Sequence, residues 1–289
     1  MRVRPASSSE CCERFPEISG GKLSRFAAAG PGHLQVVADW DRTLTTALTP
    51  DGRDHSTYAI LYDGGYLGPE YQRRSESLYR AYRTSERSAD LSQQDKQCRM
   101  EAWWTEQYDL MLASGFSSGT IDRAISDNQV RMRDGAVSLI RLLSRHRIPL
   151  LILSAGIKPF ITRYLAAQGV LDENVCIVAN DFAFDAKGLA VAYHRPLIHS
   201  LNKHRAGIVP ADHFSAVARR PNLILLGDTL EDIRAAEGLD PACTLSYGFP
   251  ESSTHPSISA YRAAYDVVIP DDGPMTPVLD LVRNITQTT

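Results

Sequence analysis

The chain has few residues of the kinds that would build a disulfide framework or a membrane anchor. Its 289 residues include five cysteines, an odd number, and no two of them form a CxxC pair. These are Cys11, Cys12, Cys98, Cys176 and Cys243. A disulfide framework or a cysteine-bound metal cluster is therefore not expected, and a reducing compartment fits this composition best. No apolar run approaches the roughly 20 residues that a membrane-spanning helix requires.

An excess of positive charge is also absent. Lys and Arg number 31 against 34 for Asp and Glu, so the formal net charge is −3 at pH 7. Proteins that bind nucleic-acid polymers or anionic membranes normally carry a basic patch. We therefore expect a small-molecule ligand, and neither a nucleic-acid polymer nor a membrane as partner. Residues 1–30 contain no apolar core segment, so they predict a flexible leader and a cytoplasmic protein.

Strand and helix patterns alternate along most of the chain. Residues 34–38, LQVVA, form a short apolar run that predicts a buried strand, and strands and helices follow in turn after residue 135. This alternation predicts an α/β fold with a parallel sheet covered on both faces. Residues 66–131 differ, with long, charged, aromatic-rich helical stretches. We therefore expect a discontinuous core, residues 31–65 and 132–289, with a helical insertion at 66–131.

Acidic residues follow two of the predicted strands. Asp39 and Asp41 follow LQVVA, and Asp228 and Asp232 follow the apolar run LILLG. Ligands of parallel α/β sheets bind beyond the carboxyl ends of the strands. A cluster of buried acids at that edge requires a neutralising cation, and hard carboxylate oxygens suit Mg²⁺.

The spacing of these residues indicates phosphoryl transfer. Asp39 and Asp41 are two apart on an extended chain, so both can face one phosphorus atom. Asp39 is the candidate nucleophile. Asp41, whose pKa a neighbouring acid would raise, is the candidate acid and base. Ser154 with the following backbone N–H groups, and Lys203, can hold phosphate oxygens.

The D-x-D-x-T motif, the strand-end serine, the lysine and the GDxxxD motif together resemble the haloacid-dehalogenase-like superfamily. LSAGI, LNKH and LLGDTLEDIRAAEG are similar to segments of its cytosolic 5′-nucleotidase III (pyrimidine 5′-nucleotidase) family. The resemblance implies a Rossmann-like core with an all-helical cap and an Mg²⁺-dependent phosphatase acting on nucleoside 5′-monophosphates. It assigns the chemistry to Asp39 and Asp41, phosphate binding to Ser154, Ala155 and Lys203, metal binding to Asp39, the Asp41 backbone and Asp228, and support to Thr43 and Asp232.

The same resemblance indicates how a base would be read. Family members carry a Glu-Trp-Trp/Tyr-Thr-Lys stretch in a cap helix, whose second aromatic residue stacks on the base. Trp104 takes that place here, and Glu86 takes the place of a base-binding glutamate. A tryptophan at this position resembles members that prefer 7-methylguanosine monophosphate, so pyrimidine nucleotides or 7-methyl-GMP are the expected substrates. Ala102, Glu106 and Tyr108 depart from the family's Glu, Lys and His.

Other interpretations of these residues remain open from the sequence. Asp232 could be an acid favoured in the first turn of a helix, and Glu86 could belong to a solvated face. A phosphatase or phosphotransferase of a specialised pathway, acting on another phosphate monoester, would use the same chemistry. A nucleotide-binding protein without turnover is the alternative from another class.

Overall fold

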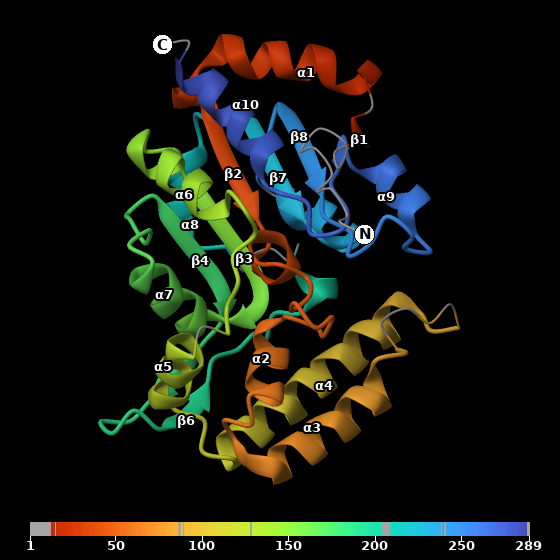
Figure 1. The fold of residues 1–289 in the computed structure, drawn as a ribbon, viewed down its shortest axis with the longest axis vertical. Coiled ribbons are helices and arrows are strands. Elements are labelled where there is room, and N and C mark those ends of the chain that lie inside the picture. Colours follow the sequence, from red (N-terminus) through yellow and green to blue (C-terminus); the bar gives the residue numbers. More distant parts are fainter. Residues whose placement is uncertain are drawn as a thin grey trace, which may run out of the picture.

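A central, mostly parallel sheet forms the core of the protein, as seen in a computed structural model (Figure 1). The structure describes residues 13–14, 16–85, 88, 90–127, 129–203, 209–237, 239 and 241–287. The strand order is β1-β9-β8-β7-β2-β3-β4, in which β1 alone runs antiparallel to its neighbour. The strands of this sheet are β1 (Glu13–Arg14), β2 (Leu34–Ala38), β3 (Leu150–Ile157), β4 (Val175–Asn180), β7 (Asn222–Gly227), β8 (Cys243–Gly248) and β9 (Val267–Val268). The predicted Rossmann-like parallel sheet is confirmed.

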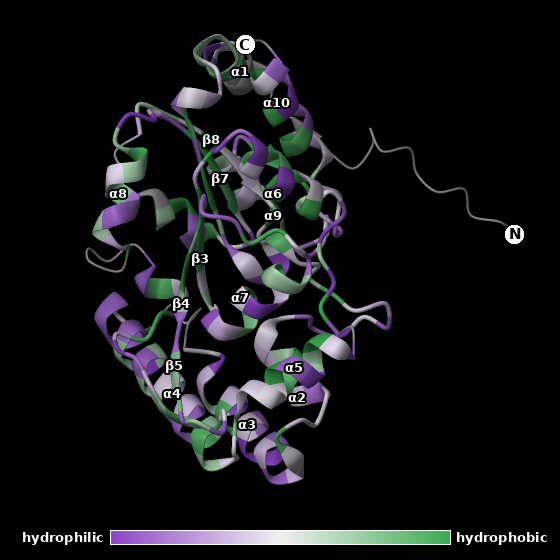
Figure 2. Ribbon diagram, turned by 90° about the vertical axis from the view of Figure 1, so that its left-hand side faces the viewer, coloured by the Kyte–Doolittle hydropathy of each residue, from purple (hydrophilic) through white to green (hydrophobic). Residues whose placement is uncertain are grey.

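Helices cover both faces of this sheet. Figure 2 shows α8 on one side of it and α6 and α7 on the other. α6 buries Ala136, Leu139, Ile140 and Leu143, a spacing that places one apolar stripe against the sheet. The core helices are α1 (Pro16–Ala29), α6 (Ala136–Arg145), α7 (Lys158–Ala167), α8 (Ala211–Val217), α9 (Ile258–Ala264) and α10 (Thr276–Gln287), with 3₁₀ helices η1 (Pro31–His33), η3 (Ser200–Asn202) and η4 (Leu230–Ala236).

Helix α1 corrects the expectation of a flexible leader over residues 1–30. The chain from Pro16 to Ala29 is helical and packs against α10 and β8. Phe26 is buried there, and Lys22 Nζ lies 2.6 Å from Asp266 Oδ1. Residues 1–12 lie outside the described part of the chain. Tertiary packing of one aromatic side chain and one ion pair holds this helix, and neither gives a periodic pattern in the sequence.

The inserted segment between β2 and β3 is helical. Its elements are the irregular turn η2 (Trp40–Leu44), α2 (Thr57–Asp63), α3 (Gly68–Tyr82), α4 (Gln93–Ala113) and α5 (Ser118–Ser126). The chain leaves the core near Leu44 and returns near Arg133, and these two segments run side by side. Thr46 N donates to Arg131 O at 3.0 Å, and Arg133 N donates to Leu44 O at 2.9 Å. In Figure 1, α3 and α4 lie beyond the carboxyl ends of β2 and β3. Within the described residues, no helix combines the length and the apolar character needed to cross a membrane.

Two further features differ from the sequence patterns. The helix that follows β7 is the 3₁₀ helix η4 and not an α-helix, and its first turn has a capping box between Thr229 and Asp232. A hairpin of β5 (Phe182–Phe184) and β6 (Ala190–Tyr193) follows β4, and α4 packs against β6. The hairpin therefore brings part of the core into contact with the inserted helices.

Candidate active site

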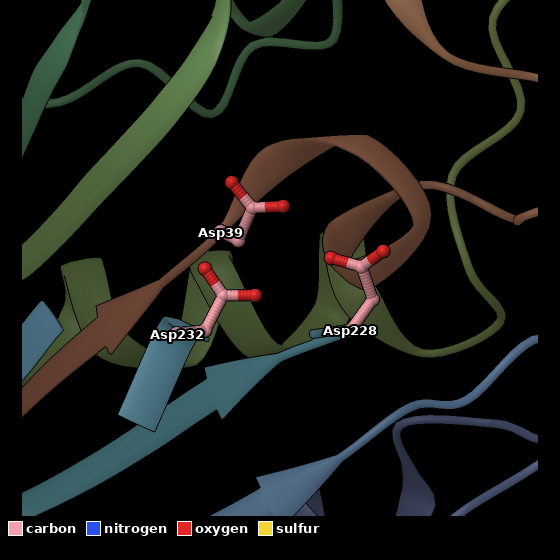
Figure 3. Close-up of side chains that lie close together, drawn as sticks. All are labelled: Asp39, Asp228 and Asp232. Atoms are coloured by element: carbon pink, nitrogen blue, oxygen red, sulfur yellow. The ribbon is translucent and has the colours of Figure 1, made fainter. Parts of the chain in front are cut away.

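Three carboxylates point toward one another beyond the carboxyl ends of β2 and β7 (Figure 3). One oxygen atom from each of Asp39, Asp228 and Asp232 lies within 4.8 Å of the other two. β2 and β7 are neighbouring strands with Ala38 opposite Leu226, and Asp39 N donates to Leu226 O at 3.0 Å. The register of the sheet therefore brings residues almost 190 positions apart to one place, since Asp39 and Asp228 both follow these strands directly.

Lys203 is the positive charge in this cluster. Its Nζ lies 2.6 Å from Asp39 Oδ1 and 2.8 Å from Asp232 Oδ1, and all three side chains are buried. Burial alone would lower the pKa of Lys203, but Asp232 and Asp39 raise it above its ordinary value. Asn202, the residue before it, caps η3 and donates to Leu197 O at 2.8 Å. These backbone contacts fix the turn that carries the lysine.

The cluster carries more negative than positive charge. Burial raises the pKa of Asp39, and Lys203 opposes that rise. Burial, followed by Asp39 and Asp232, raises the pKa of Asp228 well above its ordinary value. A divalent cation would relieve this repulsion, and an all-carboxylate donor set fits a hard cation such as Mg²⁺.

Asp232 contributes more to the cluster than its position in a first helical turn suggested. Its Oδ1 accepts from Lys203, and its Oδ2 accepts from Thr229 N at 3.0 Å and Thr229 Oγ1 at 2.8 Å. The carboxylate therefore both caps η4 and pairs with the lysine. Tyr261 of α9 and Tyr265, the residue that follows this helix, anchor the same loop, because Tyr261 donates to Asp228 O at 2.6 Å and Tyr265 donates to Thr229 O.

Asp41 lies on the adjacent turn η2 and has a different environment. Its Oδ1 accepts two hydrogen bonds from Thr57, one from the backbone N at 2.7 Å and one from Oγ1 at 2.7 Å. Burial, with a further contribution from Asp39, raises the pKa of Asp41 to about 7, while the bonds from Thr57 act in the opposite direction. A carboxyl group with this pKa can both give and take a proton near neutral pH.

The segment Ser154-Ala155-Gly156 lies inside β3. Its pairing with β4 is interrupted between Leu153 and Ile157. Ser154 is buried, and its Oγ accepts from Gly156 N at 2.9 Å. A Cβ on Gly156 would lie 3.0 Å from Asp41 Oδ2 and 3.1 Å from Ser154 Oγ. Glycine therefore allows the strand and the acidic turn to approach closely.

A buried arginine that the sequence patterns did not reveal holds the turn η2. Arg133 Nε donates to Thr43 O at 2.8 Å and Nη1 to Gly273 O at 2.9 Å, while Nη2 donates to Arg42 O. Arg42 itself has a φ of 62°, in the left-handed region. Thr43 is fully buried, and its Oγ1 has no hydrogen-bond partner among the described residues. The arginine therefore satisfies carbonyl groups of the irregular turn η2. This turn contains Asp41 and leads from β2 to the inserted helices.

Trp104 belongs to an aromatic group at the junction of the inserted helices and the core. Its ring centroid lies 4.6 Å from that of Tyr58, and Tyr108 meets it edge-on at 6.2 Å. Tyr58 OH contacts Tyr108 OH at 2.5 Å and donates to Ala155 O at 3.1 Å, which links the group to the Ser154 segment. Trp103 stacks on the other face of the group, 5.6 Å from Trp104 between ring centroids, and packs on Tyr79 and Tyr82 of α3.

Of the two tryptophans, Trp104 is therefore the one on the side of the acid cluster. Its Nε1 is buried and has no hydrogen-bond partner among the described residues. Tyr108, one of the departures from the family pattern, is fully buried beside it. Glu86 lies outside the described residues, so its place relative to Trp104 stays a prediction.

The chain is similar to known proteins over most of its length. A profile of the pyrimidine 5′-nucleotidase (UMPH-1) family matches residues 42–286. The 7-methylguanosine phosphate-specific 5′-nucleotidase A of Xenopus laevis is 27% identical over 99% of this chain and 98% of its own length. The putative cytosolic 5′-nucleotidase 3 of Caenorhabditis elegans is 31% identical over 93% of this chain and 73% of its own.

Solved structures resemble the chain over the same extent. The crystal structure of cytosolic 5′-nucleotidase IIIB bound to cytidine has a TM-score of 0.84 and 26% identity, and it covers 99% of both chains. An apo phosphoserine phosphatase, at a TM-score of 0.50 and 11% identity, shares the fold alone. Because the family profile spans most of its length, the chain belongs to the pyrimidine 5′-nucleotidase (UMPH-1) family of phosphomonoesterases, with a haloacid-dehalogenase-like fold.

Proposed function

We propose that this protein is an Mg²⁺-dependent phosphatase that hydrolyses nucleoside 5′-monophosphates through an aspartyl-phosphate on Asp39. The observation that carries the proposal is the buried contact between Lys203 Nζ and Asp39 Oδ1, at 2.6 Å, inside a cluster of carboxylates. The lysine favours the ionised form of Asp39 and supplies charge that can attract a phosphate dianion. Asp39 is thereby prepared to act as a nucleophile.

In the first step, a carboxylate oxygen of Asp39 forms a bond to phosphorus, and the bond from phosphorus to the 5′ oxygen breaks. Asp41 donates its proton to that oxygen, and the nucleoside leaves as a neutral alcohol. In the second step, a water oxygen forms a bond to phosphorus and the bond to Asp39 breaks. Asp41 takes the proton from this water, so inorganic phosphate is released and both carboxyl groups return to their starting state.

We assign the cation to Asp39, Asp228 and the backbone carbonyl of Asp41, with Asp232 and Thr43 in supporting places. When bound, Mg²⁺ supplies positive charge that makes the phosphorus more electrophilic and offsets the developing negative charge. Asp232 keeps Lys203 in place, because its Oδ1 accepts from the Nζ at 2.8 Å.

Phosphate oxygens would be held by Lys203, Ser154 and the backbone at Ala155. The interrupted pairing of β3 with β4 between Leu153 and Ile157 supports this assignment, because backbone groups outside a regular ladder can turn toward a ligand. The carbonyl of Ala155 accepts from Tyr58 and Asn180, so we assign the anion to the N–H of Ala155.

We propose that the helices within residues 66–131 form a cap that closes over the substrate and excludes bulk water. Trp104 would stack on the base and Glu86 would hydrogen-bond to it, with pyrimidine nucleotides or 7-methyl-GMP as substrates. A cationic methylated purine would gain about 0.5–2 kcal/mol from the indole face. The substrate named for the Xenopus laevis relative supports this choice, and the name of the Caenorhabditis elegans relative supports a cytosolic location.

The test is phosphate release with Mg²⁺ from CMP, UMP, GMP, AMP and 7-methyl-GMP, with Asp39→Asn as the blank. We expect turnover confined to one or two of these nucleotides and lost in the variant. Turnover of 4-nitrophenyl phosphate without turnover of any nucleotide would support the phosphatase activity and reject nucleotides as its substrates. An equally active Asp39→Asn variant would reject the mechanism.

A further inference from the structure

We infer that Thr57 is a positioning residue for the acid–base group, because it orients Asp41 with Oδ2 as the proton-carrying oxygen. Both the backbone N and the Oγ1 of Thr57 lie 2.7 Å from Asp41 Oδ1. The inference rests on the proposed function, in which Asp41 transfers the proton. Thr57 belongs to none of the motifs recognised in the sequence.

The two hydrogen bonds determine which oxygen can carry the proton. An oxygen that already accepts two short hydrogen bonds has no remaining direction for a proton of its own. Oδ1 of Asp41 is therefore an acceptor only, and the transferable proton belongs on Oδ2. Without the hydroxyl of Thr57, only the bond from its backbone N remains, and Oδ1 regains a direction in which it can carry the proton.

The geometry around Gly156 shows where Oδ2 faces. A Cβ placed on this glycine would lie 3.0 Å from Asp41 Oδ2, 3.1 Å from Ser154 Oγ and 3.3 Å from Thr57 Oγ1. Oδ2 is thus on the side of the segment that is proposed to hold the phosphate. In the proposed function, a proton on Oδ2 would therefore be carried on the side from which the leaving oxygen of the phosphate ester takes it.

Thr57 is itself held firmly relative to the turn that carries Asp41. It is the first residue of α2, and Ser56 is the N-cap. Asp54 accepts from Ser56 Oγ at 3.1 Å and from Arg42 Nη2 at 2.8 Å. Turn η2 and the start of α2 are therefore tied together at two points, the Arg42–Asp54 ion pair and the Thr57–Asp41 contact. A fully buried Thr57 side chain, 1% exposed, completes this arrangement.

The experiment compares leaving groups that differ in their need for a proton. A nucleoside 5′-oxygen leaves as a poor alkoxide unless it is protonated, whereas 4-nitrophenolate leaves readily without help. For Thr57→Val, which removes only the hydroxyl, we expect kcat to fall about 10-fold on the nucleotide that is turned over and less than about 2-fold on 4-nitrophenyl phosphate. KM should change little, and Thr57→Ser, which restores the hydroxyl, should restore kcat.

Tyr58 follows Thr57 directly and contacts Trp104, so an effect on base binding must be separated from an effect on Asp41. The Asp41→Asn variant makes this separation. In that background, Thr57→Val should cause no further loss, because the group that it positions is gone. A loss of the same size in both backgrounds would overturn the inference, as would an equal loss on both substrates.

Further variants keep these outcomes distinct. Thr120→Val removes another buried hydroxyl, which contacts Ser117 Oγ at 3.0 Å in α5, and should leave the ratio of the two activities unchanged. Should Thr57→Val fail to fold, Thr57→Ala gives the same comparison. Full activity of Asp41→Asn on the nucleotide would reject the proposed function. A low activity of Asp41→Asn with an unaffected Thr57→Val would reject the role of Thr57 alone.

Discussion

The acid cluster and the aromatic group around Trp104 lie close together but are built in opposite ways. The acid cluster takes Asp39, Lys203 and Asp232 from distant segments, and ion pairs of 2.6 and 2.8 Å hold them in a buried place. The aromatic group takes Trp104 and Tyr108 from a single helix, and ring contacts join them to Tyr58. Charges in a buried site tolerate little displacement, whereas ring contacts can shift at small cost. We therefore expect the acid cluster to tolerate few substitutions, and the aromatic group to tolerate substitutions that change the base preference.

The largest effect is expected where a charge is removed from the acid cluster. Lys203→Met leaves Asp39 and Asp232 buried without their cation, so it should cost about 3 kcal/mol of folding free energy, measured by urea unfolding, and abolish turnover. The matched control is Lys158→Met. That lysine pairs with Asp181 at 3.0 Å with both side chains partly exposed, and its loss should cost less than about 1 kcal/mol. Equal losses of folding free energy for Lys203→Met and Lys158→Met would contradict the view that burial makes the ion pairs of the acid cluster more important than a surface pair.

Removal of the cation should have the next largest effect. Chelator-treated protein should lose turnover and regain it with Mg²⁺. At about 100 times its Kd, Mg²⁺ should stabilise the fold by about 2–3 kcal/mol, because it binds the folded state alone. Thermal unfolding with and without Mg²⁺ measures this shift. Asp228→Asn should abolish the shift and Trp104→Ala should keep it. A wild-type protein that Mg²⁺ does not stabilise would contradict the assignment of a metal to the acid cluster.

Truncation of the aromatic group should change binding more than chemistry. Trp104→Ala should raise KM for the preferred nucleotide about 10-fold, because stacking contributes about 1–3 kcal/mol per base. Its kcat, and its activity on 4-nitrophenyl phosphate, should change much less. Trp103→Ala is the neighbouring comparison. Trp103 stacks on Trp104 and also contacts Tyr79 and Tyr82, so its removal should lower stability and raise KM much less than Trp104→Ala. A larger rise in KM for Trp103→Ala than for Trp104→Ala would mean that Trp103, and not Trp104, stacks on the base.

The smallest effect is expected at the edge of the acid cluster. Tyr265→Phe removes one hydrogen bond to Thr229 O and should cost about 1 kcal/mol in thermal or urea unfolding. Tyr261 still holds the carbonyl of Asp228, so the affinity for Mg²⁺ should fall only slightly. A loss as large as that of Lys203→Met would mean that the α9 contacts, and not the lysine, hold this loop.

The sequence was informative where a local pattern carries the structure. The apolar run Leu34–Ala38 predicted β2, and the acids that follow it were correctly placed beyond the end of a strand. Motif spacing brought Lys203 into the same prediction, and the structure places it against Asp39. The functional roles of these residues stay predictions, although the contacts support them.

The sequence was uninformative where a contact between distant residues decides the outcome. Thr57 lies sixteen positions after Asp41 and meets it only because turn η2 and helix α2 are tied together. Arg133 and Gly156 act through carbonyl groups and close approach, which no residue pattern records. Helix α1 is held by tertiary packing, so its segment was mistaken for a flexible leader.

The sequence by itself therefore determined the parallel-sheet core and the inserted helices, and it named the residues that are proposed to carry the chemistry. These follow from hydrophobic periodicity and from short motifs, each of which is local in the sequence. Only the tertiary structure decided how the carboxylates are oriented, which tryptophan faces the core and what holds each acid in place. The physical reason is that hydrogen-bond direction and burial depend on neighbours that folding brings together from distant parts of the chain.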